Sequence, residues 1–302
     1  MKLFALALLA ASPVAASDGT LVIAGGAVSP DNAAIYRAFI DAAKGGSIAI
    51  IPSASGEPQA SIDSFAANLD RHGVERGRIV EVRLAEQDDP ATPADEAAWA
   101  VNADSRSEIA KIESAGGIWF TGGDQARTMR LLMRDGKDLP MLTAIRKRLA
   151  AGAVIGGSSA GAAIMGIGMI VCGDPRQAGT QAVSRDPADC AVEEGGSEPL
   201  VLANGLGFLL GTVVDQHFSE RGRLPRLARA VACGAGQGLG VDENTAIVID
   251  LARRTATVVG AGSVTAIARS RKPGTCNPSS FADFSISQYR ADATIKLRGG
   301  LC

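Results

Sequence analysis

The stretch AVIGGSSAGAAIM, residues 153–165, joins an apolar run directly to a glycine-rich turn and a run of small residues. Within it, Gly157 to Gly161 form the pattern G-x-S-x-G, with Ser159 at the centre. A strand that turns sharply into a helix holds the central serine outward, and the flanking glycines let the two backbones approach each other. The stretch therefore predicts a nucleophile elbow with the Ser159 hydroxyl as the attacking group.

The pattern needs support from elsewhere because the chain contains 36 glycines, which makes a chance match common. The alternative is a glycine-rich turn without a chemical role in an α/β protein. A nucleophilic serine requires a base, an acid that orients the base, and donors for the oxyanion. These partners should lie at the carboxyl ends of other strands.

Short apolar runs rich in β-branched residues alternate with amphipathic segments along the chain. Before and within the quoted stretch, the runs predict strands over 21–24, 47–51, 79–84, 118–121 and 153–155, and the amphipathic segments predict helices over 33–43 and 105–114. Later strand-like runs cover 212–214, 238–241, 246–249, 256–259 and 264–268, with a hairpin connection over 250–255. This order predicts an α/β fold in which helices flank a mostly parallel sheet, with antiparallel strands added toward the C-terminus.

The segment Met1–Ser17 has the pattern of an export signal, with Lys2, an apolar run and small residues suited to cleavage after Ala16 or Ser17. It is too short for a stable membrane span. Residues 18–302 contain no low-complexity linker or internal repeat, which predicts a single α/β domain. We expect a periplasmic or extracellular protein without membrane attachment once the signal is removed.

Composition argues against two kinds of site. A formal net charge of -2 and an aromatic content of 4% do not favour nucleic-acid binding. The chain has no C-x-x-C or H-x-x-x-H spacing, so a zinc site is not expected.

Five cysteines in an exported protein indicate disulfides. Cys172 and Cys190 flank a loop-like segment, and Cys276 and Cys302 bracket the C-terminal tail, so we predict these two pairings. Cys233 is then left over, and we expect a small buried hydrophobic residue there because no basic residue sits beside it to activate the thiol.

The chain offers two histidines as the base for Ser159. His72 precedes Gly73 at a predicted helix end, where an imidazole complements the helix dipole. His217 follows an apolar run at a predicted strand end, where it would face the same crevice as the elbow, so it is the better base. A structural histidine near the surface is the alternative for His217.

The orienting acid and the oxyanion donors also come from predicted strand ends. Asp242 and Glu243 follow a strand-like run, and the residues alone do not separate them as partner of His217. The order serine, histidine, acid differs from that of α/β-hydrolases, which indicates a different fold. The N–H of Ala160 is one natural oxyanion donor, and the Gly122-Gly123 turn, with Gly123 as the donor, supplies a second.

Three arginines, Arg221, Arg223 and Arg226, follow His217 at the predicted start of a helix. Cations at a helix N-terminus oppose the helix dipole, so helix stabilisation does not explain them. Guanidinium groups bind carboxylates in a bidentate manner, which predicts an acidic substrate group. The alternative is a solvated surface in which the arginines pair with Glu220.

Four blocks of sequence now resemble the cyanophycinases, in the serine peptidase family that also contains aspartyl dipeptidases. The blocks are FTGGDQ at 120–125, GGSSAGA at 156–162, DQHFSERGRLPRL at 215–227 and GLGVDENTA at 238–246. They run in the family's order. Ser158 stands where the family commonly has threonine, which should leave the elbow intact.

The resemblance implies a fold similar to class I glutamine amidotransferases, often dimeric, without a metal or organic cofactor. It implies hydrolysis of cyanophycin, a polyaspartate with arginine on each side-chain carboxyl, to β-Asp-Arg dipeptides. Ser159 would be the nucleophile, His217 the base and Glu243 the orienting acid. It also implies six substrate-binding residues, which are Gln125, Asp215, Gln216, Arg221, Arg223 and Arg226. Asp215 or another carboxylate of the pocket would meet the substrate guanidinium.

Two other functions fit the same sequence. One is a dipeptidase for aspartyl or isoaspartyl dipeptides, although the extended block after His217 favours the polymer. The other is a non-catalytic relative that binds acidic or arginine-rich peptides, although the complete serine, histidine and acid set argues against it. The export signal favours an exported member that meets polymer released by other organisms.

Overall fold

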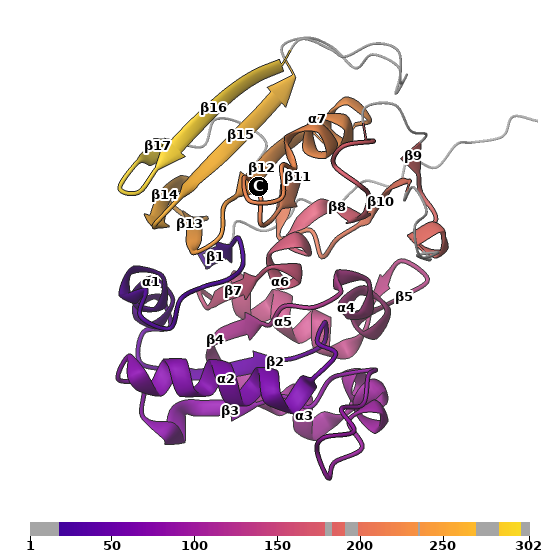
Figure 1. Ribbon diagram of the computed structural model, residues 1–302. Helices are drawn as coiled ribbons and strands as arrows, with labels where there is room; N and C mark the ends of the chain where they lie inside the picture. Colours follow the sequence, from indigo (N-terminus) through magenta and orange to yellow (C-terminus); the bar gives the residue numbers. More distant parts are fainter. Residues whose placement is uncertain (1–17, 179–182, 191–198, 235, 270–283, 297–302) are drawn as a thin grey trace, which may run out of the picture.

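The computed structural model describes residues 18–178, 183–190, 199–234, 236–269 and 284–296. In these ranges the chain forms two large β-sheets with covering helices (Figure 1). The export signal predicted over Met1–Ser17 lies outside the described residues. So does the predicted pairing of Cys276 with Cys302.

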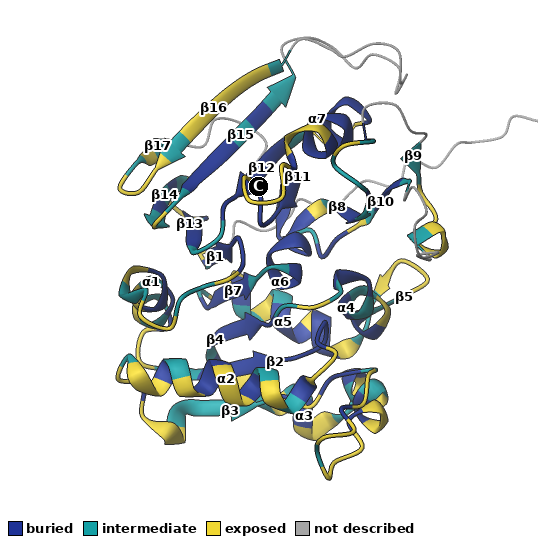
Figure 2. Ribbon diagram, viewed as in Figure 1, coloured by how far each residue is buried: buried dark blue, intermediate teal, exposed yellow. Residues whose placement is uncertain are grey.

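The first sheet has eight strands within the described residues, in the order β17-β14-β13-β1-β7-β4-β2-β3. Its parallel strands are β1 (Thr20–Ala24), β7 (Val154–Ser158), β4 (Ala115–Phe120), β2 (Ser47–Ile51) and β3 (Ile79–Glu81). The inner four are almost completely buried, as Figure 2 shows in dark blue. Covered on both faces, such strands are apolar along their whole length, and this is the pattern that predicted them.

Helices cover both faces of this sheet. The helices and short 3₁₀ segments are α1 (Ala33–Ala42), α2 (Pro58–Arg71), η1 (Arg76–Arg78), η2 (Ala97–Asp104), α3 (Arg106–Ser114), α4 (Gln125–Leu132) and α5 (Pro140–Ala150). Val22 packs with the apolar residues of α1 and α2, whereas its neighbour Leu21 packs with those of α3 and α5. The alternation follows from the two-residue period of a strand. A small hairpin of β5 (Met133–Arg134) and β6 (Lys137–Asp138) follows α4.

Antiparallel strands extend the first sheet, as the sequence predicts. β13 (Thr245–Asp250) pairs with β1, and β14 (Thr255–Gly260) and then β17 (Thr294–Lys296) follow it. Asp250 lies opposite Thr255 in the register, so the predicted hairpin over 250–255 is confirmed.

A second sheet, with seven strands in the described ranges, is the main feature that the sequence did not predict. In the order of the sheet it consists of β16 (Phe284–Arg290), β15 (Ser263–Arg269), β12 (Gln237–Val241), β11 (Leu209–Asp215), β8 (Gly166–Cys172), β10 (Leu200–Asn204) and β9 (Val183–Ser184). The predicted strands over 212–214, 238–241 and 264–268 belong here. Local alternation reveals a strand but not its neighbours, because pairing depends on segments distant in sequence.

The second sheet carries the elements that follow the elbow. α6 (Ala160–Ala163) leads from β7 to β8, and α7 (Leu224–Ala232) connects the parallel strands β11 and β12. The short segment η3 (Pro187–Cys190) lies near β10. No helix among the described residues is long and apolar enough to cross a bilayer.

The cysteine predictions have two different outcomes. Cys172, at the end of β8, forms a disulfide with Cys190 in η3, as predicted. Cys233, after α7, is also disulfide-bonded. The expectation of an unpaired Cys233 is therefore wrong. Cysteine spacing does not define connectivity, because a disulfide depends on which segments meet in space.

Candidate active site

Ser159 lies at the turn between β7 and α6 with φ 56° and ψ -115°. Residues with a side chain rarely adopt a positive φ, so the surrounding structure must impose it. A Cβ at Gly157 would lie 2.3 Å from Gly161 O, and a Cβ at Gly161 would lie 2.3 Å from Phe120 O. Close backbone contacts therefore require both glycines of the G-x-S-x-G pattern, as the sequence predicts.

His217, just after β11, is the imidazole that contacts Ser159. Ser159 Oγ lies 2.9 Å from His217 Nε2, and His217 Nδ1 lies 2.6 Å from Glu243 Oε1. An ionised carboxylate only accepts hydrogen bonds, so Nδ1 donates to Glu243 and Nε2 accepts from the serine hydroxyl. Ser159, His217 and Glu243 come from three segments distant in sequence and are joined by hydrogen bonds. We call them the hydrogen-bonded series.

The structure shows which of the two candidate acids contacts His217, a choice that the sequence did not make. Asp242 Oδ1 accepts hydrogen bonds from N–H and Oγ of Ser219, and Asp242 Oδ2 accepts from N–H and Oγ of Ser263. Both oxygens of the buried carboxylate therefore join the turn at Ser219 to the start of β15. Glu243, whose side chain is 33% exposed, is the acid that reaches His217.

The loop after β1 holds this series in place, and the sequence analysis did not identify it. Three successive carbonyls accept backbone N–H groups of the site: Ala24 from Ser159 at 3.1 Å, Gly25 from His217 at 2.7 Å and Gly26 from Asn244 at 2.8 Å. A Cβ at Gly26 would lie 2.3 Å from His217 Cε1. The available signal was a pair of glycines directly after a buried strand, which often marks a close backbone approach.

Burial and nearby charges determine the protonation of His217. Burial lowers the pKa of His217 below its usual 6.5, the hydrogen bond to Glu243 raises it, and the positive charges of Arg221 and Arg223 lower it further. The net direction is downward. The imidazole is therefore neutral at neutral pH, which is the form that accepts a proton from the serine.

His72 occupies the helix end that the sequence predicts. It is the C-cap residue of α2. Its Nε2 lies 2.8 Å from Pro30 O, and its ring stacks on Tyr36 with centroids 4.4 Å apart. These contacts account for His72 as a structural residue.

A cavity of about 500 Å³ opens beside Ser159, and we call it the arginine cavity. Five of the six predicted substrate-binding residues line it, namely Gln125, Gln216, Arg221, Arg223 and Arg226. Cys172 and Cys190 also line it, so the disulfide forms part of its wall.

Asp215 is the exception among the six, because it does not line the cavity and its exposed fraction is 1%. Arg226 binds both of its oxygens, with Nε 2.8 Å from Oδ2 and Nη2 on Oδ1, and Arg223 Nη1 lies 3.4 Å from Oδ1. A carboxylate that already binds two guanidinium groups has little capacity for a third. The structure thus places Asp215 against Arg223 and Arg226 and not in the wall of the cavity, where it was expected to meet a substrate guanidinium.

The three arginines differ in burial and in the ion pairs that they form. Arg223 and Arg226 are buried, whereas Arg221 is exposed and forms no ion pair with another described residue. Burial lowers the pKa of Arg223 to about 10, with the charge of Arg226 as the next cause, so it stays charged at neutral pH. Glu220 accepts from the N–H of Glu243 at 3.2 Å, and none of these arginines pairs with it.

Two buried polar atoms at this cavity have no hydrogen-bond partner among the described residues. They are Gln216 Oε1 and Arg223 Nε. An unsatisfied buried polar atom costs about 1–3 kcal/mol. Because both residues line the cavity, a bound molecule with a donor and an acceptor would recover this loss.

Of the remaining predicted site residues, Gly123 and Gln125 follow β4, and Ala160 follows Ser159. Gln125 begins α4, and its amide nitrogen donates to Ile170 O at 2.9 Å and to Val171 O at 2.6 Å, so it fixes the end of β8. Gly123 lines the arginine cavity, and Ala160 begins α6. Neither the Gly123 N–H nor the Ala160 N–H donates to a carbonyl group within the described part of the chain. Both remain available as oxyanion donors.

A metal site is not found in the described ranges, because no three His, Cys, Asp or Glu side chains gather there. The polar groups at the elbow are thus the serine, the imidazole, the carboxylate and the neighbouring backbone N–H groups. This arrangement suits nucleophilic attack by an activated hydroxyl.

Comparisons with known proteins agree on one family. The chain matches the model of Peptidase family S51 over residues 98–255. It is 31% identical over 260 residues to the cyanophycinase of Trichormus variabilis, which covers 85% of this chain and 75% of the relative. It is 31% identical over 222 residues to the cyanophycinase of Geminocystis herdmanii, which covers 73% of this chain and 68% of the relative.

A solved structure shows the same fold. The crystal structure of a peptidase from an acI-B1 Actinobacterium matches with a TM-score of 0.62 at 19% identity, covering 94% of this chain and 98% of that chain. Fold and family together define a serine-type peptidase on a mixed α/β scaffold. The chain belongs to Peptidase family S51, and its relatives make it a serine peptidase of the cyanophycinase type.

Proposed function

We propose that this chain is an exported serine exopeptidase that hydrolyses cyanophycin to β-Asp-Arg dipeptides, with Ser159, His217 and Glu243 as its catalytic residues. The observation that carries the proposal is the hydrogen-bonded series from Ser159 Oγ through His217 to Glu243 at the mouth of the arginine cavity. The names of its relatives supply the substrate.

The chemistry follows from the protonation of this series. His217 Nε2 takes the proton of Ser159 as Oγ attacks the substrate carbonyl carbon, and Glu243 stabilises the imidazolium that forms. The N–H groups of Ala160 and Gly123 donate to the oxyanion of the tetrahedral intermediate. His217 then protonates the leaving amine, the C–N bond breaks and an acyl-enzyme remains. A water molecule, deprotonated by His217, attacks the acyl-enzyme and releases the acid product.

The arginine cavity matches an acidic substrate group. The aspartyl units of cyanophycin carry groups derived from carboxyls. Where such a carboxyl group is free, it is a hydrogen-bond acceptor that two guanidinium groups bind strongly. Arg221 offers an exposed guanidinium, and Arg223 offers the unpaired Nε. Gln216 Oε1 then accepts an amide N–H of the substrate. We propose that the chain-terminal carboxylate enters this cavity, which makes cleavage proceed from a chain end.

Replacing the nucleophile tests the mechanism. Ser159→Ala removes the attacking oxygen, so release of β-Asp-Arg from cyanophycin should fall by at least a thousandfold, as for nucleophiles of related design. The measurement is chromatographic quantification of the dipeptide. Ser107→Ala, which changes an exposed serine in α3, is the matched control and should retain full activity. Equal activity of the wild type and Ser159→Ala would reject the mechanism.

The same assay decides between the polymer and short substrates. An aspartyl dipeptidase would cleave isolated aspartyl dipeptides and leave cyanophycin intact. Release of β-Asp-Arg from the polymer without further cleavage to aspartate and arginine is the result expected here.

The proposed export of the protein is tested by a separate measurement. The disulfide between Cys172 and Cys190 supports an oxidising compartment. Expressed from the full sequence, the protein should be recovered outside the cytoplasm with Ser17 or Asp18 as its first residue, as determined by N-terminal sequencing. Recovery of the intact chain from the cytoplasm alone would contradict the proposal.

A further inference from the structure

A second cavity, of about 470 Å³, adjoins the elbow, and we call it the α2 cavity. Gly122 and Ser158 line it, whereas the next residues, Gly123 and Ser159, line the arginine cavity. A Cβ at Gly122 would lie 3.9 Å from Ser159 Oγ, so the α2 cavity extends to the nucleophile. A substrate held at Ser159 can therefore place one part in each cavity.

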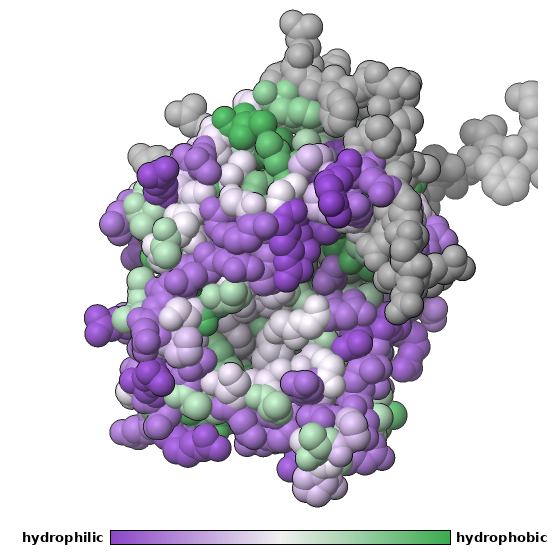
Figure 3. Space-filling model, in the orientation of Figure 1, coloured by the Kyte–Doolittle hydropathy of each residue, from purple (hydrophilic) through white to green (hydrophobic). Residues whose placement is uncertain are grey.

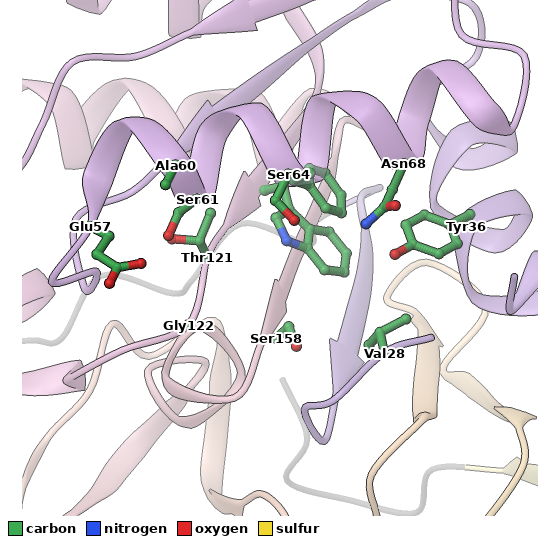
Figure 4. Close-up of a pocket in the computed structure, with 12 residues that line it drawn as sticks. Val28, Tyr36, Glu57, Ala60, Ser61, Ser64, Asn68, Thr121, Gly122 and Ser158 are labelled. Carbon is green, nitrogen blue, oxygen red and sulfur yellow. The ribbon is translucent and has the colours of Figure 1, made fainter. Parts of the chain in front are cut away.

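Figure 4 shows how the side chains that line the α2 cavity are arranged along α2. Side chains of Ala60, Ser61, Ser64 and Asn68 come from one face of α2, with Glu57 at one end of the row and Tyr36 beyond the other end. The Thr121 side chain lies beside Ser61, near the Glu57 end of the row. In the space-filling view of Figure 3 the molecule is hollowed above α2, and pale and green residues line the hollow. The cavity is an open, elongated site and not a sealed void.

Two polar side chains of this wall form no side-chain hydrogen bond or ion pair with another described residue. Thr121 is 7% exposed, and its Oγ1 has no hydrogen-bond partner among the described residues. The Glu57 carboxylate is exposed and forms no ion pair or side-chain hydrogen bond with another described residue. A buried hydroxyl without a partner is unfavourable unless a ligand satisfies it. Both groups can accept hydrogen bonds from a ligand.

The two cavities carry opposite charge. Arg130, Arg221, Arg223 and Arg226 line the arginine cavity, against the single acid Asp124. The described residues of the α2 cavity include no Lys, Arg or His, and Glu57 is its one ionisable carboxylate. Phe65 and Trp119, whose rings stack on each other, add an apolar part to the wall. The α2 cavity is thus suited to a cationic arm, whereas the arginine cavity is suited to an anionic one.

We infer that the α2 cavity binds an arginyl arm of the substrate, on the opposite side of the scissile bond from the arginine cavity. This inference rests on the proposed function. Glu57 pairs with the guanidinium, and Thr121 Oγ1 hydrogen-bonds with the amide that attaches the arginine to its aspartate. Thr121 is bonded to Gly122, which lies beside Ser159, so the arm extends from Ser159 past Thr121 to Glu57. Recognition of a second unit is then a reason to prefer an oligomer to a single dipeptide.

The test measures binding without turnover. Isothermal titration calorimetry of the full-length Ser159→Ala protein uses the two-unit peptide (β-Asp-Arg)₂ and two analogues, each with citrulline replacing one arginine. Citrulline keeps the shape of arginine but lacks its charge. At one of the two positions citrulline should weaken binding about tenfold, the size of a charge-assisted hydrogen bond. Glu57→Gln, added to Ser159→Ala, should abolish this difference.

Two further variants complete the design. Asp63→Asn removes a carboxylate from the same helix outside the cavity, so the citrulline penalty should persist. Thr121→Val, which keeps the shape of the side chain, should weaken binding of all three peptides by a few-fold and leave the penalty intact. An equal citrulline penalty in the Glu57→Gln and Asp63→Asn proteins would overturn the inference, as would a lack of measurable binding. Polymer hydrolysis by the wild type tests the proposed function separately.

Discussion

His217 combines a buried imidazole with one anionic and two cationic neighbours. Glu243 bonds to its Nδ1 and raises its pKa, while burial, Arg221 and Arg223 lower it. Because the lowering effects dominate, the neutral base persists to a pH below 6.5. The arginines proposed to bind the substrate carboxylate therefore also lower the pKa of the imidazole proposed as the base.

This electrostatic balance predicts a pH profile. The acid limb of kcat/KM reports the pKa of His217 in the free enzyme, so its midpoint should lie below pH 6.5. Arg221→Gln removes a positive charge that lowers this pKa, so the midpoint should move to higher pH, whatever happens to KM. Arg253→Gln, on the hairpin between β13 and β14, should leave it in place. A midpoint that stays or falls in Arg221→Gln would contradict the assignment.

Neighbouring acids show how much a single residue's role depends on its surroundings. Asp242 and Glu243 are adjacent and chemically alike, and the sequence could not choose between them. Asp242 points to Ser219 and Ser263 and joins a turn to the start of β15, whereas Glu243 points to His217. The choice depends on the direction of each side chain after β12, which composition and spacing do not encode.

Among the elements, the end of β1 has the widest influence on the site. Its pairing with β7 brings Ala24 beside Ser158, and its pairing with β13 brings Ala24 opposite Ala246. The loop that follows therefore lies between the serine segment and the acid segment. Its carbonyls hold the backbones of Ser159 and His217.

Gly26 provides a test of this arrangement. Gly26→Ala introduces a methyl group 2.3 Å from His217 Cε1, so the imidazole must move. Displacement by about 1 Å lowers rates on the order of a hundredfold, and kcat should fall by this amount in a folded protein. Gly45→Ala also changes a glycine at positive φ, but nothing lies within 4 Å of its Cβ.

Gly45→Ala should therefore cost about 1 kcal/mol of stability and leave kcat unchanged. Kinetics together with thermal unfolding separate the two effects. Similar losses of kcat in both variants would show that backbone strain, and not contact with His217, is responsible.

For the whole molecule, the two sheets are packed on a common apolar core. One cluster of buried residues includes Leu21 and Ile155 from the first sheet together with Met169, Val214 and Leu239 from the second. Ser159 follows a strand of the first sheet, whereas His217 follows a strand of the second. The hydrogen-bonded series thus bridges the two sheets, and its geometry depends on how they pack together.

The sequence by itself predicted most of the parallel strands and the residues of the candidate site. Apolar runs predicted the parallel strands because such strands are buried on both faces, and the G-x-S-x-G pattern predicted the elbow because only glycine permits its close contacts. The scarcity of histidine left two candidates for the base, and the predicted strand end favoured His217 over His72.

Only the tertiary structure decided the second sheet, the commitment of Asp215 to the arginines, the pairing state of Cys233 and the support from the loop after β1. Each depends on contacts between segments far apart in sequence, and local patterns carry no information about which distant segments meet.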